Sequence, residues 1–184
     1  MPSQHLMDFA TFARNTNPQD PAPVHLWDPP YCGDLDIVIR RDGSWFHEGR
    51  PIRRVELVQL FSSILKKENN RYYLVTPVEK VGITVEDCPF VVVGMDVSRT
   101  GGVQVLTFST NTDEQISADS FHRLTVGNTE GVGSPHPVIH VRNGLNGLLS
   151  RAVFYRLCEL SVEHHYEQTS RLGVFSSGIF FPLD

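Results

Sequence analysis

The first folded segment of the chain is predicted to be a β-hairpin, because apolar and polar residues alternate on both sides of a tight turn. Residues 35–41 read LDIVIRR, Asp42-Gly43 follows, and SWFHEG returns. Asp-Gly between two alternating segments is a strong short-range hairpin signal. Ahead of it, residues 15–23 hold three prolines and no large apolar side chain, which indicates a loose connector after a short N-terminal segment.

A helix is predicted between Arg53 and Lys67, where apolar residues recur every three or four positions. Pro51 stands just before this segment and Asn69-Asn70 just after it, as start and stop signals. Two strands are expected next, YYLVTP and KVGITVED, with a break at Thr76-Pro77 because proline cannot donate to a central ladder. The apolar helical positions are Leu57, Val58, Phe61, Ile64 and Leu65.

The second half of the chain begins with another predicted hairpin, in which PFVVVGMDV and VQVLTFST flank the turn residues 98–102. Shorter strands are expected in three places, near 114–117, 121–126 and 137–141. From Leu145 to Leu160 the apolar residues follow helical spacing and predict one helix of about 19 residues, capped by Asn143. Residues 171–183 are expected to form a final extended segment on the core.

The order of these elements predicts the fold class. Each half has strands before a single helix and at least one strand after it, which suggests a duplicated structure without visible sequence repetition. Strands grouped before helices favour an α+β fold over a doubly wound parallel sheet. We expect two related halves, each a mostly antiparallel sheet with one helix, divided into an N-terminal arm and linker at 1–24, a first half at 25–80 and a second half at 81–184.

Composition and charge narrow the classes of ligand. The 184 residues are 40% hydrophobic and 20% charged, with a formal net charge of −5, which argues against a protein that holds a nucleic acid polymer through its phosphates. Residues 36–80 nevertheless have a net charge of +3, so the remaining residues have a net charge of −8. Arginine suits carboxylate or phosphate, and an anionic ligand touching the first half is plausible. Solvated surface arginines are the alternative interpretation.

The cysteines and the N-terminus bear on location. Cys32, Cys88 and Cys158 are odd in number and widely separated, which fits a reducing compartment better than a disulfide framework. The N-terminus lacks a basic region followed by an apolar run, and no stretch approaches 18 uninterrupted apolar residues. We therefore expect a cytoplasmic protein that is neither exported nor inserted in a membrane.

Motifs for catalysis, metals and cofactors give little support to those functions. On a strand, the rings of His136 and His140 would stand roughly 13 Å apart, too far to share one zinc ion. The GNTEGVG loop lacks the ending of a phosphate loop and the spacing of a dinucleotide fold. Cys32 is the best candidate nucleophile, but no partner is specified. We expect no metal and no cofactor, and we assign no catalytic residue.

A family resemblance adds to this picture. WDPPYCGDLDIVIRRDGSWFHEGRPIRRVELVQLF and then YYLVTPVEKVGITVEDCPFVVVGMDV resemble an uncharacterised bacterial family, domain of unknown function 1285, and the match extends to the helix containing Arg151. The most specific pieces are CGDLDI, DGSWFHEGRPI, YYLVTPVEK and VEDCPFVV. The resemblance implies two related halves, the second similar to a pleckstrin-homology domain, and a nucleotide-type ligand site in a cleft between them.

The resemblance also marks residues able to bind such a ligand. Aromatic rings can stack on a base, arginine can hold an anionic group bidentately, and a carboxylate can accept from a ribose or a base nitrogen. Each of these residues has a structural alternative, such as fixing a turn. The motif positions are Tyr31, Asp36, Arg53, Tyr73, Thr76, Glu79, Lys80, Asp87 and Arg142.

Three functions remain open at this point. We favour a non-catalytic module, with a role in signalling, that recognises a small anionic, nucleotide-like ligand and reports it to a protein partner. A protein-interaction scaffold is an alternative, because antiparallel sheets expose edges to which a peptide can add a strand. An enzyme using Cys32, or a carboxylate pair around Asp36 and Glu79, is the third hypothesis.

Overall fold

The computed structural model describes residues 21–128 and 133–184, which fall into two compact units. The first unit ends at Pro89 and the second runs from Phe90 to Asp184. We expected the division after residue 80, but residues 80–85 form a strand inside the first sheet, so the units divide after that strand. Within the described residues, no helix is long and apolar enough to cross a membrane.

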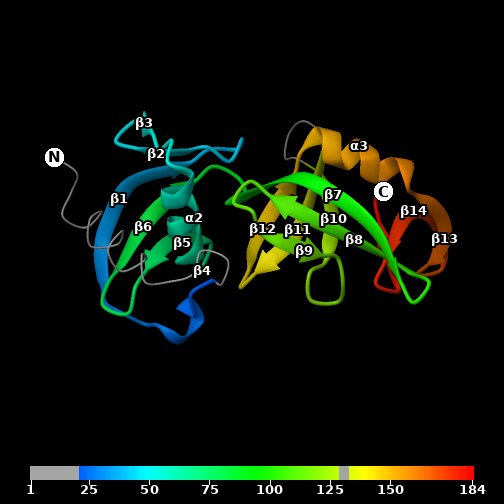
Figure 1. The fold of residues 1–184 in the computed structure, drawn as a ribbon, viewed down its shortest axis with the longest axis horizontal. Coiled ribbons are helices and arrows are strands. Elements are labelled where there is room, and N and C mark those ends of the chain that lie inside the picture. Colours follow the sequence, from blue (N-terminus) through cyan, green and yellow to red (C-terminus); the bar gives the residue numbers. More distant parts are fainter. Residues whose placement is uncertain (1–20, 129–132) are drawn as a thin grey trace. The chain divides into compact units, whose positions relative to one another are not determined.

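The first unit is a six-stranded sheet with one α-helix (Figure 1). Its strands lie in the order β3-β2-β1-β6-β5-β4, and all neighbours are antiparallel except β1 and β6. The elements are the 3-10 turn η1 (Val24–Leu26), β1 (Tyr31–Ile39), β2 (Trp45–His47), β3 (Arg50–Pro51), α2 (Val55–Ser63), β4 (Leu65–Glu68), β5 (Arg71–Val75) and β6 (Lys80–Val85).

The core of the first unit joins α2 to the sheet. Phe61 of α2 stacks on Trp45 of β2, with ring centroids 6.2 Å apart. Ile37 and Ile39 of β1 and Leu74 of β5 are fully buried with them. On the other face of β5, Arg71 is exposed and Tyr73 is half-buried, whereas Val75 at the end of the strand is buried. The predicted hairpin of β1 and β2 is confirmed, with Ile39 opposite Trp45.

The second unit contains a six-stranded sheet, one α-helix and a three-stranded sheet. The larger sheet has the order β10-β11-β12-β7-β8-β9, and the smaller has the order β13-β14-β15. The elements are β7 (Phe90–Thr100), β8 (Val103–Thr110), β9 (Gln115–Ser117), β10 (Leu124–Asn128), β11 (Pro135–Arg142), β12 (Leu145–Leu149), α3 (Arg151–Glu159), β13 (Val162–Tyr166), β14 (Thr169–Ser176) and β15 (Ile179–Pro182).

The two larger sheets repeat one topology. Each consists of two antiparallel, three-stranded meanders, and the first strand of one meander pairs in parallel with the last strand of the other. In the first unit these strands are β1 and β6, and in the second unit they are β7 and β12. The helix differs in place, since α2 lies between the meanders and α3 follows the second one. The predicted α+β fold with two related halves is confirmed.

The predicted first helix ends earlier than expected. The hydroxyls of Ser62 and Ser63 donate to the carbonyls of Gln59 and Leu60 in the preceding turn. Such local bonds offer the backbone an alternative to continuing the helix. Ile64 is the C-cap of α2, and Leu65 begins strand β4, in which it lies opposite Leu74.

The predicted long helix from Leu145 is wrong in its first part. Asn143 and Gly144 have φ values of 46° and 75° and form a two-residue turn, not a helix cap, so that Arg142 lies opposite Leu145. Residues 145–149 form β12, in which burial alternates. The helix begins only at Arg151, where the Ser150 hydroxyl accepts a hydrogen bond from the N–H of Val153.

Candidate functional site

The best candidate site is a cluster of rings and cations on the first sheet, where β1, β6 and β5 are neighbours. Three of the predicted binding residues meet there, namely Tyr31, Tyr73 and Lys80, because Tyr31 lies opposite Lys80 and Tyr73 lies opposite Gly82, two residues further along β6. Arg71, which is not one of the predicted binding residues, completes the cluster. We call these four side chains the tyrosine–arginine cluster.

Arg71 is central to this cluster. Its guanidinium carbon lies 5.8 Å from the ring centroid of Tyr31 and 5.5 Å from that of Tyr73, and the two rings meet edge to face at 6.3 Å. The ammonium of Lys80 lies 5.2 Å from the Tyr73 ring. These are cation–π distances, and Tyr31 remains 49% exposed. A ligand approaching from solvent can therefore reach both a ring and a fixed guanidinium.

The partner of Arg71 is Asp34, at 2.8 Å between Nη2 and Oδ1. Gly82 makes this pair possible, because a Cβ at position 82 would collide with the Asp34 carboxylate and touch the Arg71 guanidinium. The side chains of Arg71 and Asp34 are 56% and 64% exposed. Exposed pairs contribute little to stability, so an anionic ligand could replace Asp34 at low energetic cost.

Lys80 of the cluster shares the carboxylate of Glu68 with a lysine outside the cluster, Lys66. Glu68 Oε1 lies 2.7 Å from Lys66 Nζ, and Glu68 Oε2 lies 2.8 Å from Lys80 Nζ. Hydrogen bonds from Lys66 and then Lys80 lower the pKa of Glu68, and the bond to Glu68 raises the pKa of Lys80. Lys66 also donates to the carbonyl of Trp27 at 2.9 Å. Both ammonium groups are therefore held in place, and the raised pKa of Lys80 keeps that group charged at neutral pH.

The other predicted residues of the first unit lie elsewhere. Thr76 and Glu79 shape the turn between β5 and β6, where the Thr76 hydroxyl accepts from the N–H of Glu79 at 3.2 Å. Asp36 is exposed on β1, and Arg53 is exposed just before α2. Asp87 pairs with Arg41 at 3.0 Å. None of these contacts includes a member of the tyrosine–arginine cluster.

Arg142, the remaining predicted residue, belongs to the second unit. Its side chain is largely buried, pairs with Glu114, and lies 5.0 Å from the ring centroid of Phe90. The Arg142 side chain is only 12% exposed, against 56% for that of Arg71, so it is much less accessible to a ligand from solvent.

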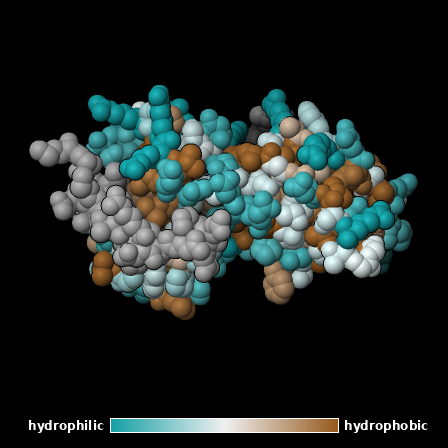
Figure 2. All heavy atoms as spheres, viewed as in Figure 1, coloured by the Kyte–Doolittle hydropathy of each residue, from teal (hydrophilic) through white to brown (hydrophobic). Residues whose placement is uncertain are grey.

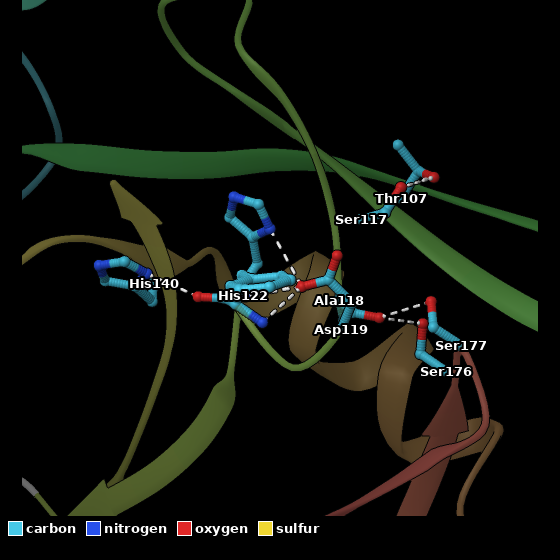
Figure 3. A network of polar contacts seen from close by, with 9 residues as sticks. Thr107, Ser117, Ala118, Asp119, His122, His140, Ser176 and Ser177 are labelled. Atoms are coloured by element: carbon cyan, nitrogen blue, oxygen red, sulfur yellow. Dashed lines mark hydrogen bonds and ion pairs between the residues drawn. The ribbon is translucent and has the colours of Figure 1, made fainter. Parts of the chain in front are cut away.

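A polar network in the second unit also has a structural role (Figure 3). The carboxylate of Asp119 accepts from the backbone N–H of Phe121 and from the N–H and ring of His122. His140 Nδ1 donates to the carbonyl of Phe121 at 2.9 Å, while its Nε2 accepts from the N–H of Gly144 at 3.1 Å. With both ring nitrogens occupied, His140 holds two turns together and offers no lone pair to a metal.

The cysteines differ in exposure. All three are free, and Cys32 is exposed on β1, where its thiol donates to the carbonyl of Pro30. Cys88 is buried, and burial together with the nearby charge of Asp87 raises its pKa to about 12. Burial also raises the pKa of Cys158. The thiolate is the reactive form, so Cys88 is poorly suited to nucleophilic chemistry at neutral pH.

Cys88 is therefore expected to resist alkylation in the folded protein. At a pKa of about 12, roughly one thiol in ten thousand is ionised at pH 8. Iodoacetamide at pH 8 should modify Cys32 and leave Cys88 unmodified, as measured by peptide mass spectrometry. Addition of urea should make Cys88 reactive as well. A Cys88 that reacts as fast as Cys32 in the native protein would contradict this environment.

Comparisons with known proteins identify the family. Residues 22–88 match the model "Domain of unknown function (DUF1285), N-terminal domain", and residues 89–183 match "Protein of unknown function (DUF1285), C-terminal domain". No match was found among curated proteins.

Two solved structures are similar to the chain. A DUF1285 family protein from Silicibacter pomeroyi is 47% identical, with a TM-score of 0.85 over 95% of this chain and 93% of that one. A DUF1285 family protein from Shewanella baltica is 29% identical, with a TM-score of 0.52 over 66% of this chain and 89% of that one. Both domain models and both structures agree, and the chain belongs to the DUF1285 family.

Proposed function

We propose that this protein is a non-catalytic module that binds a small anionic, nucleotide-like ligand at the tyrosine–arginine cluster of its first unit. The observation that supports this most directly is the placement of the Arg71 guanidinium beside two tyrosine rings, one of them half exposed. Guanidinium binds phosphate or carboxylate bidentately, and an exposed aromatic ring can stack on a base. One compact cluster therefore offers both kinds of contact that a nucleotide needs.

The ligand's anionic group would take the place of Asp34 at Arg71. Both side chains of that pair are exposed, and such pairs contribute little to stability. A phosphate carries more charge than a carboxylate and presents more acceptor oxygens, so it competes well for the same donors. Lys80 and Lys66, held by Glu68, add positive charge close to the Tyr73 ring.

A binding role fits the acid–base state of the cluster better than a catalytic one. A general acid or base works best when its pKa is near the operating pH. The pKa of Glu68 is lowered by its two lysine partners, which moves it away from neutrality. We also propose that occupancy of this site is reported to a protein partner, which is a role in signalling. The three free cysteines support a cytoplasmic location.

The test is a ligand screen on the full chain. Thermal-shift assays, followed by calorimetry, would use mononucleotides, dinucleotides, inorganic phosphate and small carboxylates. We expect at least one nucleotide to raise the melting temperature, because a ligand at about 100 times its Kd stabilises the folded state by about 2.7 kcal/mol. The shift should disappear in Arg71→Ala and weaken in Tyr31→Ala.

Arg99→Ala is the matched control, since Arg99 is an exposed arginine on β7 of the second unit. It should leave the shift unchanged. If no anionic ligand stabilises the protein, the proposed function is wrong. If a stabilising ligand binds Arg71→Ala as tightly as the wild type, the ligand site is not at the tyrosine–arginine cluster.

A further inference from the structure

The outer side of β13 is an open sheet edge. In the three-stranded sheet the order is β13-β14-β15, so β13 has a neighbour on one side only among the described residues. Residues 162–165 are exposed and Tyr166 is half-buried. Figure 1 shows β13 and β14 at one end of the second unit, and Figure 2 shows mostly hydrophilic residues there. An open edge is a template for a further strand.

The hairpin geometry shows which backbone groups are available. Glu167 and Gln168 have φ values of 47° and 70°, which make the two-residue turn between β13 and β14 a mirror-image type. In such a hairpin the residues flanking the turn, Tyr166 and Thr169, exchange hydrogen bonds, and inward and outward residues then alternate along the strand. The backbone N–H and carbonyl groups of Glu163 and His165 therefore point away from β14.

One face of β13 contacts aromatic rings of the other two strands of its sheet. The ring of His164 lies 5.0 Å from that of Phe175 and 4.8 Å from that of Phe180, and Tyr166 lies 5.5 Å from Phe180. The opposite face carries Glu163, whose carboxylate accepts from the Ser170 hydroxyl. One face of β13 is thus packed on aromatic rings, and little further ordering is needed to add a strand.

We infer that β13 pairs antiparallel with β13 of a second copy of this chain, with the two His164 residues opposite each other. In this register Glu163 of each copy lies opposite His165 of the other. Each of these two pairs exchanges two hydrogen bonds between the outward backbone groups, which gives four in all. The contact is two-fold symmetric and closes on itself, because the same strand is used on both sides.

The side chains select this register over its neighbours. Hydrogen bonds can form only between residues whose backbone groups point outward, here Glu163 and His165. The neighbouring registers are therefore those in which the partner strand is shifted by two residues. One shift places Glu163 opposite Glu163, which is repulsive, and the other separates Glu163 from His165. The register centred on His164 instead places a carboxylate opposite an imidazole twice. It also places Val162 opposite Tyr166, a β-branched residue facing an aromatic one.

Charge variants of the full chain test the dimer. Sedimentation velocity at rising protein concentration should show a reversible monomer–dimer equilibrium for the wild type. Glu163→Lys should raise the dimer dissociation constant about tenfold or more, because it removes the carboxylate from both cross-strand pairs. Exchanging the two residues, as Glu163→His with His165→Glu, restores the pairs and should restore the dimer. Glu167→Lys makes the same charge change in the turn and should have little effect.

A backbone variant tests the hydrogen bonds independently of charge. His165→Pro removes an outward N–H that β14 does not use, and two of the four intermolecular bonds with it, so it should also disrupt the dimer. The inference is overturned if the wild type stays monomeric at every concentration, or if its dimer survives Glu163→Lys and His165→Pro. An edge that joins only some other protein would overturn it too. These variants lie in the second unit and leave the ligand screen of the first unit unaffected.

Discussion

Phe61→Ala is expected to lower the free energy of unfolding of the first unit by about 3–5 kcal/mol. The Phe61 side chain is 0% exposed and stacks on Trp45, so its removal loses apolar burial and leaves a cavity between α2 and β2. Urea unfolding followed by tryptophan fluorescence measures this directly, because both tryptophans, Trp27 and Trp45, belong to the first unit.

Phe121→Ala provides the matched control for this loss. Phe121 is 79% exposed in a turn of the second unit, and surface substitutions usually change stability by no more than about 0.5 kcal/mol. The same atoms are removed in both variants, so the difference between them measures burial. Equal effects of the two substitutions would mean that Phe61 is not in the core.

Gly173→Ala is expected to destabilise the second unit by about 2–3 kcal/mol. A Cβ at this position of β14 would collide with the carbonyl oxygen of Phe181 and with the Phe180 ring. Backbone on the neighbouring strand β15 cannot move aside without breaking the pairing of Gly173 with Pro182. Thermal unfolding followed by far-ultraviolet circular dichroism should show a lower melting temperature than in the wild type.

Gly127→Ala separates this collision from a general effect of adding a methyl group to a strand. Gly127 lies on β10, and nothing stands within 4 Å of the position that its Cβ would occupy. That variant should melt close to the wild type. A Gly173→Ala protein that melts like Gly127→Ala would show that β15 does not pack against β14 as described.

Hydrophobic patterning predicted the strands better than the helix ends. The hairpins at Asp42-Gly43 and after β7 follow from turn residues between alternating segments, and both are present. Leu145, Leu148 and Leu149 fit helical spacing, but in β12 only Leu145 and Leu149 share the buried face, and the segment is too short for spacing alone to decide between helix and strand. Asn143-Gly144 is as clear a hairpin signal as Asp42-Gly43, and giving it priority over spacing would have placed β12 correctly.

The candidate site was only partly predictable, because local sequence patterns do not specify which distant strands pair. Tyr31, Tyr73 and Lys80 came from motif positions, but their proximity depends on β1 pairing in parallel with β6, a long-range contact that no local pattern specifies. Arg71 could have been found from alternation alone. It stands two residues before Tyr73 on the same strand, so both side chains must lie on one face of the sheet.

The repeated topology has a consequence for how the protein emerges from the ribosome. In each unit the strand made first pairs in parallel with the strand made sixth, as β1 does with β6 and β7 with β12. The edge of β1 that pairs with β6 therefore stays unpaired until β6 has left the exit tunnel. The edge of β7 that pairs with β12 stays unpaired in the same way until β12 has emerged. During synthesis each half therefore passes through a state with an unpaired central strand edge, and such edges are prone to aggregation.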